Sequence, residues 1–70
     1  MSPEIEVIDF RRKVRYMIVK APLHGYDLVF VDWSYQGKPW DYVDPILVNA
    51  SFEECLVKLL EVVKKSSFGH

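Results

Sequence analysis

The sequence predicts an α+β fold: an antiparallel four-stranded β-meander with one C-terminal amphipathic helix packed on one face, in the order β-β-β-β-α. Three observations lead to this prediction. Short β-branched or alternating apolar stretches occupy residues 5–48, polar or Pro- and Gly-containing segments separate them, and a helical pattern follows from Ser51. The chain has 70 residues, which we expect to form a single domain, 1–70.

The first two strands are predicted over residues 5–10 and 14–19, with Arg11-Arg12-Lys13 as the turn between them. Pairing around this turn sets apolar side chains opposite one another on a single face of the hairpin. The expected pairs on that face are Val7 with Tyr16 and Ile5 with Ile18. The reverse face is mixed and collects Glu6, Ile8, Arg15 and Met17.

The third strand is predicted over residues 26–35, after a loop at residues 21–25 that contains Pro22 and Gly25. Its centre is apolar on both faces, as expected for an interior strand. The chain then returns over residues 40–43, is interrupted at Asp44-Pro45, and resumes over residues 46–48. Because proline has no N–H to donate to a ladder, we expect this last strand at the edge of the sheet.

The helix begins with Ser51-Phe52-Glu53-Glu54, a capping box in which the serine oxygen and the Glu54 carboxylate each satisfy a backbone N–H. Apolar residues at helical spacing then form one stripe, which we expect to be buried. The stripe consists of Phe52, Cys55, Leu56, Leu59, Leu60 and Val63. The expected ion pairs along the helix are Glu54 with Lys58 and Glu61 with Lys65.

Residues 33–42 carry four large aromatic side chains that flank a predicted turn at residues 36–39. In an antiparallel hairpin with that turn, all four rings lie on one face as two cross-strand pairs. The four are Trp33, Tyr35, Trp40 and Tyr42. One interpretation is structural: the rings pack beneath the helix or hold the hairpin together. The other is an exposed platform that stacks on a partner, with Lys38 at its tip.

The basic residues cluster at the first turn and comprise Arg11, Arg12, Lys13 and Arg15. One interpretation of this cluster is simply a solvated hairpin turn. Together with exposed rings it also suits single-stranded nucleic acid, because bases stack on aromatic side chains while cations follow the phosphates. Repulsion from nearby aspartates opposes the second interpretation; they are Asp27, Asp32, Asp41 and Asp44.

These aspartates are not expected to bind a metal. The predicted register directs Asp32 and Asp41 to one face and the other two to the opposite face, whereas hard cations need several convergent oxygens. We interpret all four as solvated carboxylates at strand ends. Cys55 is expected in the core, and His24 is a lone loop histidine. We therefore expect no catalytic residue, no cofactor and no enzymatic activity.

Composition indicates the setting in which the protein works. The formal net charge is −1, so no overall attraction to nucleic acid or to anionic membranes is expected. One cysteine, no signal-peptide pattern and no long apolar run predict a soluble, cytoplasmic protein without a membrane partner. Hydrophobic residues make up 50% of this short chain, which favours a protein partner, including a second copy in a homodimer.

The end of the chain, a strand followed by Ser51-Phe52-Glu53-Glu54 and a helix, resembles small antitoxin-type β-sheet domains of the HicB kind. This resemblance covers under a third of the chain, and no functional residue is transferred from it. The residues themselves predict a small protein-interaction module, such as a regulator, an assembly subunit or a virus-encoded inhibitor. Its expected partner-binding residues are Trp33, Tyr35, Lys38, Trp40 and Tyr42. The alternative is a module that binds single-stranded nucleic acid through the aromatic hairpin together with Arg11, Arg12, Lys13 and Arg15.

Overall fold

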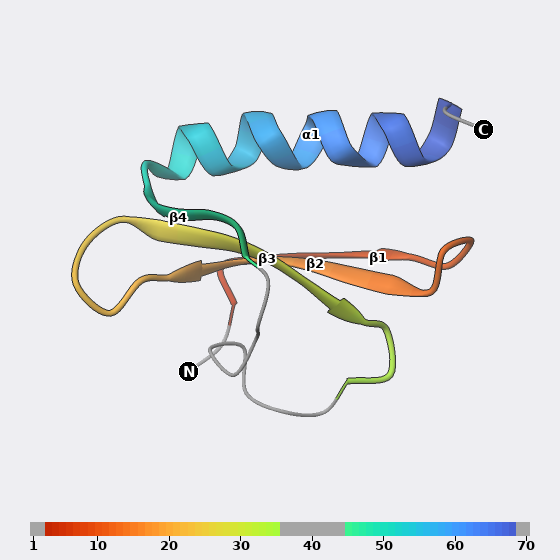
Figure 1. The fold of residues 1–70 in the computed structure, drawn as a ribbon, viewed down its shortest axis with the longest axis horizontal. Coiled ribbons are helices and arrows are strands. Elements are labelled where there is room, and N and C mark those ends of the chain that lie inside the picture. Colours follow the sequence, from red (N-terminus) through yellow and green to blue (C-terminus); the bar gives the residue numbers. More distant parts are fainter. Residues whose placement is uncertain (1–2, 36–44, 69–70) are drawn as a thin grey trace.

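The computed structural model describes residues 3–35 and 45–68, which form one antiparallel sheet of four strands and one helix lying across it (Figure 1). The strand order within the sheet is β1-β2-β3-β4, so each strand neighbours the next along the chain. The predicted fold class is therefore confirmed. The elements are β1 (Ile5–Asp9), β2 (Val14–Lys20), β3 (Tyr26–Asp32), β4 (Pro45–Ala50) and α1 (Phe52–Phe68).

The hairpin of β1 and β2 has the register that the sequence predicts. Its pairs include Ile5 with Ile18 and Val7 with Tyr16. The turn between the two strands is closed by Asp9, whose Oδ1 accepts hydrogen bonds from the backbone N–H groups of Arg11 at 3.0 Å and Arg12 at 3.1 Å. An aspartate that accepts from its own turn in this way stabilises the turn without a glycine. Lys13 completes it with a φ of 61°.

Strand β3 ends at Asp32, so the prediction of a strand that continues through Tyr35 is wrong. The Asp32 side chain accepts hydrogen bonds from both the backbone N–H and the hydroxyl of Ser34, and the N–H of Tyr35 donates to the Asp32 carbonyl at 2.9 Å. Local bonds of this kind offer the backbone an alternative to a sheet ladder. The chain therefore turns here. The predicted turn at residues 36–39 and the arm at residues 40–43 lie outside the described residues.

Strand β4 lies at the edge of the sheet and pairs with β3 through two register shifts, as expected for a strand interrupted near a proline. The structure corrects the interpretation of Asp27 as a solvated carboxylate. Asp27 is buried, and its Oδ1 accepts a hydrogen bond from the backbone N–H of Asn49 at 2.9 Å. Asn49 has a φ of 51°, so its N–H is turned out of the regular ladder at this point. Asp27 thus holds the irregular part of β4.

Helix α1 starts with the predicted capping box. The N–H of Glu54 donates to Ser51 Oγ, and the N–H of Ser51 donates to Glu54 Oε1, both at 3.0 Å. Because the Glu54 carboxylate is engaged at the cap, the predicted ion pair of Glu54 with Lys58 does not form. Lys58 Nζ instead pairs with the carboxylate of Glu61 at 3.4 Å. A capping box of this kind stabilises a helix start by satisfying two N–H groups reciprocally.

The buried stripe of α1 differs from the prediction at two positions. Leu60 is 62% exposed, whereas Val62 packs against the core. Successive residues lie about 100° apart around a helix, so Leu60 points away once Leu59 is centred on the sheet. The sequence pattern alone does not distinguish these positions, because both are apolar.

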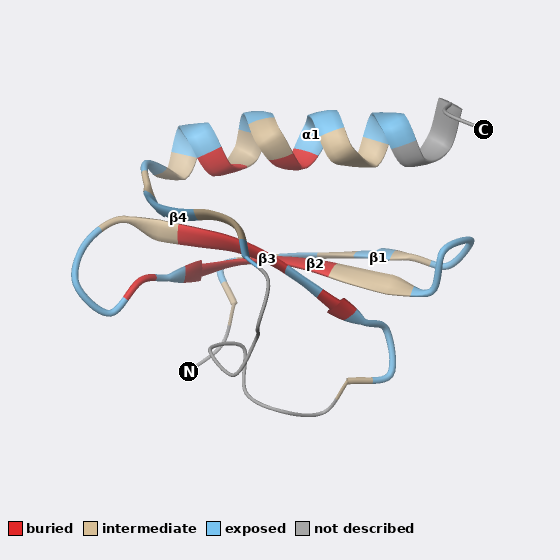
Figure 2. Cartoon of the chain, viewed as in Figure 1, coloured by how far each residue is buried: buried red, intermediate tan, exposed pale blue. Residues whose placement is uncertain are grey.

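Apolar side chains pack on both sides of the sheet, and Figure 2 shows the buried positions on β2, β3 and the underside of α1. The cluster between sheet and helix consists of Tyr16, Ile18, Leu28, Cys55 and Leu59. The cluster on the far side of the sheet consists of Met17, Val19, Val29 and Val31, with Tyr35 packed against it. The expectation that the third strand is apolar on both faces is confirmed.

The hydrogen bonds at the helix cap make the free energy of unfolding depend on pH in the acidic range. Hydrogen bonds from the backbone N–H and the hydroxyl of Ser51 hold the pKa of Glu54 below its ordinary value of 4.5. The stabilisation is therefore complete above pH 4.5 and is lost as pH falls through the lowered pKa of the folded state. We expect the variant Glu54→Gln to lose less stability than the wild type over this acidic range.

Urea unfolding followed by circular dichroism at a series of pH values measures this difference. Glu53→Gln is the matched control, because it removes the same charge from the same helical turn. An equal acid sensitivity in the two variants would show that the Ser51–Glu54 bonds are not responsible.

Candidate functional site

The described half of the predicted aromatic hairpin does not form a flat platform. Trp33 is 43% exposed, and its ring packs edge-on against Phe10, with the ring centroids 6.5 Å apart and an interplanar angle of 61°. Tyr35 is instead half-buried against the far-side cluster. The chain turns between the two residues, so they serve different parts of the molecule. Lys38, Trp40 and Tyr42 lie outside the described residues.

The structure places Trp33 next to the basic turn, the two features that the nucleic-acid alternative combines. The N–H of Trp33 donates to the carbonyl of Lys13 at 3.0 Å, and Lys13 Nζ lies 5.3 Å from the centroid of the Trp33 ring. A cation at this distance is attracted to the negative face of an indole. Phe10 is 70% exposed beside them. We name this surface the basic-aromatic end; it consists of Phe10, Arg11, Arg12, Lys13 and Trp33.

Phe10 is the member of this surface that sequence reasoning missed. The sequence predicts Phe10 as the last residue of the first strand, whereas β1 ends at Asp9 and Phe10 belongs to the turn. Asp9 stands two residues before Arg11, where the polar run begins, and an aspartate at that position is a turn signal that places Phe10 outside the strand. The exposed Phe10 ring lies against the exposed Trp33 ring, and adjoining exposed apolar side chains, rather than single ones, mark interaction sites.

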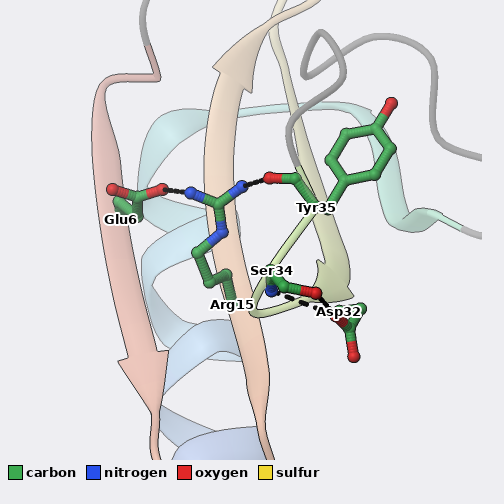
Figure 3. Close-up of polar contacts among 5 residues, drawn as sticks. All are labelled: Glu6, Arg15, Asp32, Ser34 and Tyr35. Carbon is green, nitrogen blue, oxygen red and sulfur yellow. Dashed lines mark hydrogen bonds and ion pairs between the residues drawn. The ribbon is translucent and has the colours of Figure 1, made fainter.

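Arg15 does not join the other basic residues at this surface. Its Nη1 forms an ion pair with Glu6 at 3.0 Å, and its Nη2 donates to the backbone carbonyl of Tyr35 (Figure 3). The side chain is half-buried on the far side of the sheet, next to Met17 in β2. Arg15 therefore ties β1 and β2 to the segment after β3, and a phosphate could reach it only by breaking these contacts.

Charged side chains are unevenly distributed along the molecule. The C-terminal part of α1 lies at the same end as the turn between β1 and β2, and the start of α1 lies at the other end (Figure 1). Most of the exposed cations described therefore gather at the first end, namely Arg11, Arg12, Lys13, Lys64 and Lys65, whereas Lys20 lies at the other end of β2. The exposed carboxylates Glu53 and Glu54 occupy the helix start. This separation favours the approach of anionic groups to the basic-aromatic end.

Within the described ranges, two carboxylates beside this surface, Asp9 and Asp32, accept hydrogen bonds from their own turns. Asp9 accepts the two turn N–H groups described above. Hydrogen bonds from the hydroxyl and then the N–H of Ser34 hold the pKa of Asp32 below its ordinary value. By contrast, neither Arg11 nor Arg12 forms an ion pair within the part of the chain that the structure describes. Their charges are therefore available to a partner.

A groove of about 180 Å³ lies between the sheet and α1 next to the basic-aromatic end. Its lining residues are Arg12, Val14, Tyr16, Phe30, Ile46 and Val62. The rings of Tyr16 and Phe30 meet at a centroid distance of 6.4 Å, and Arg12 Nη1 donates to the Tyr16 hydroxyl at 3.4 Å. A larger open depression on the outside of α1 is lined by Glu53, Glu54, Val57, Lys58 and Glu61. That depression has no second wall, because all its residues belong to one helix.

The side chains that could act in catalysis or metal binding, among them Cys55 and His24, do not lie together in the part of the chain that the structure describes. Cys55 is fully buried, as predicted, and its Sγ donates to the carbonyl of Tyr26 at 3.7 Å. Burial raises the pKa of the Cys55 thiol, and the negative charges of Asp27 and Glu54 raise it further. The thiol therefore stays in its unreactive neutral form. His24 is exposed in the loop between β2 and β3. Among residues 3–35 and 45–68, no three His, Cys, Asp or Glu side chains are grouped to hold a metal ion.

Both edges of the sheet carry features that oppose strand pairing with another molecule. Strand β1 is short and is flanked or occupied by Glu4, Glu6 and Asp9. Strand β4 begins with Pro45, contains register shifts and has Asn49 at a positive φ. Charges, prolines and bulges are the usual means by which edge strands avoid pairing. A partner is therefore expected at a side-chain surface.

No family model, curated protein or solved structure matches the chain, so the resemblance of its C-terminal end to HicB-type domains gains no support. Within the described ranges, no helix has the length and apolar character needed to cross a lipid bilayer.

Proposed function

We propose that the protein is a small, non-enzymatic interaction module that binds another protein through the basic-aromatic end. The observation that carries this proposal is the exposed ring pair of Phe10 and Trp33 with Lys13 beside it and two arginines in the same turn. Aromatic side chains and arginines supply most of the energetically dominant contacts in protein interfaces. Rigid rings also lose little conformational entropy when a partner covers them.

The same surface favours a different protein over a second copy of this chain. Two copies joined by a two-fold axis would bring the same patch of each into contact. Here that contact would set the cations of Arg11, Arg12 and Lys13 against their own copies, and like charges across an interface are unfavourable. We therefore propose a hetero-partner at this end. A homodimer is a separate proposal, which sedimentation across a range of protein concentrations measures.

The double substitution Phe10→Ala with Trp33→Ala tests the surface. We expect it to weaken partner binding by about 2 kcal/mol or more, which is roughly a 30-fold loss of affinity. The partner is first captured from the native cell extract with the tagged wild-type protein. Binding of the purified pair is then measured by titration calorimetry.

Leu23→Ala is the matched control, because Leu23 is the most exposed large apolar side chain described, at 85%, and lies in the loop at the opposite end. This variant should bind as the wild type does. Circular dichroism shows whether the double variant keeps its fold. A folded double variant that captures the same partner with unchanged affinity would contradict the proposal.

A second candidate, single-stranded nucleic acid, is favoured by the position of Lys13 over the Trp33 ring. A base stacked on an exposed ring would place its phosphates near the cations of the turn. Three phosphate contacts predict a slope of about −2 for log affinity against log salt concentration, at roughly 0.7 for each contact on a single strand. Fluorescence anisotropy of a labelled oligothymidylate measures this slope. An absence of binding at low salt removes this candidate.

A further inference from the structure

We infer that the groove between the sheet and α1 receives one bulky apolar side chain from an acidic segment of the partner protein, while Arg12 pairs with a carboxylate of that segment. This inference rests on the proposed function and specifies the chemistry of the partner. It adds to the basic-aromatic end a second contact area on the helix side of the sheet.

The walls of the groove indicate an apolar occupant. Strand β2 contributes Val14, β4 contributes Ile46 and α1 contributes Val62, so three separate elements present aliphatic side chains to it. The Phe30 ring completes the wall and is 43% exposed. An apolar side chain placed here would cover surface that water now contacts, at a gain of roughly 25 cal/mol for each Å².

The size of the groove indicates a single side chain rather than a small-molecule ligand. Its volume is about 180 Å³. Pockets that enclose small molecules or cofactors have volumes of roughly 300–1,000 Å³. The groove volume suits a protein segment that inserts one leucine- or tryptophan-sized side chain and leaves the rest of its chain outside.

Arg12 at the mouth of the groove indicates a carboxylate next to that side chain. The guanidinium makes one long hydrogen bond, from Nη1 to the Tyr16 hydroxyl at 3.4 Å, and the rest of the residue is exposed. An arginine has five N–H donors in a planar fork that matches the two oxygens of a carboxylate. The exposed cations Arg11, Lys13, Lys64 and Lys65 belong to the same end of the molecule, and their positive charge speeds the arrival of an acidic segment.

A nucleic-acid base fits this groove less well. The edge of a base carries hydrogen-bonding groups, and burying them against Val14, Ile46 and Val62 would leave those groups without partners. A base would gain more from stacking on the Phe10 or Trp33 ring, which lies outside the groove. The two kinds of partner therefore contact different residues, and this difference can be measured.

The test uses a short fluorescein-labelled peptide of alternating Glu and Asp with one central Leu, and a matched peptide with Ala in place of Leu. Binding to the full chain is measured by anisotropy, and NMR amide shifts locate the contact. We expect the leucine peptide to bind more tightly than the alanine peptide. The largest shifts are expected at the amides of Val14, Tyr16, Phe30, Ile46 and Val62.

Arg12→Glu and Arg11→Glu form a matched pair of variants, because they change the charge equally in one exposed turn but only Arg12 lines the groove. Loss of a hydrogen-bonded ion pair predicts about a tenfold weaker affinity for Arg12→Glu. Arg11→Glu loses only long-range attraction, which predicts about a twofold to threefold effect.

Three outcomes would overturn the inference: equal losses in the two variants, equal binding of the leucine and alanine peptides, or groove shifts caused by oligothymidylate and not by peptide. The proposed function is judged separately by the capture experiment with Phe10→Ala and Trp33→Ala. If capture depends on those rings while the peptide test fails, the groove inference is wrong and the proposed function stands. If the peptide binds in the groove while capture ignores the rings, Phe10 and Trp33 are not part of the binding surface and the proposed function is wrong as stated.

Discussion

Replacing Leu28 by alanine is expected to lower the free energy of unfolding by about 2–5 kcal/mol. Leu28 is 0% exposed and lies in the cluster between the sheet and the helix. It is also paired with Leu47 of β4, so its side chain meets the region where the edge strand and α1 join the sheet. Truncation removes apolar contacts from these elements and leaves a cavity that rigid neighbours cannot fill.

The magnitude matters because the domain is small. Folded domains are stable by about 5–15 kcal/mol, and short chains bury a smaller fraction of their surface than long ones. A loss at the upper end of the expected range would leave Leu28→Ala mostly unfolded. Chemical unfolding followed by circular dichroism measures the loss.

Leu23→Ala is again the matched control, because it makes the same chemical change at a side chain that is almost fully exposed. Its stability should lie within about 0.5 kcal/mol of the wild type. Similar losses for Leu28→Ala and Leu23→Ala would mean that the cluster beneath the helix is not the main core.

Replacing Gly25 by alanine is expected to destabilise the protein through its backbone. Gly25 has a φ of 73°, a left-handed conformation that costs an L-residue about 1–2 kcal/mol. An added Cβ would also lie 2.7 Å from the carbonyl oxygen of Ala50 and 3.0 Å from the carbonyl carbon of Asn49. These are backbone atoms at the end of β4, so relief requires the edge strand to move away from β3.

The expected loss therefore exceeds the conformational cost alone, and it extends to α1, because the helix begins directly after Ala50 and Ser51. Thermal unfolding of Gly25→Ala measures it. A synthetic chain with D-alanine at position 25 is the matched control: it accepts a positive φ and directs its methyl group along the other Cα substituent direction. An L-alanine variant as stable as the wild type would contradict the close approach between the loop and β4.

Features that depend on neighbours in the chain could be predicted from the sequence. The register of β1 and β2 follows from alternation on both sides of one short turn, and the predicted pairing of Val7 with Tyr16 is confirmed. The start of α1 follows from the Ser51–Glu54 capping box. Each of these features is determined over a few residues, where geometry leaves few alternatives.

Other features depend on competing local and long-range interactions, and the sequence pattern alone does not show which interaction is stronger. At Asp32, the strand propensity of the aromatic residues that follow competed with an aspartate–serine turn, and the turn prevailed. Aspartate is a residue type usually found at the surface, but Asp27 is buried because the displaced N–H of Asn49 needs a hydrogen-bond acceptor in the interior. The exposure of Leu60 depends on the rotation of α1 over the sheet, which is set by the side chains that it meets.

The sequence by itself determined the elements, their order, the first hairpin and the helix cap, because these depend on local periodicity and local hydrogen bonds. Only the tertiary structure decided that Phe10 and Lys13 meet Trp33, since they are distant in the chain and are joined by the pairing of Val14 with Asp32. The groove beside Arg12 likewise needs β2, β3, β4 and α1 together. A binding surface built from several elements exists only once long-range contacts have placed those elements side by side.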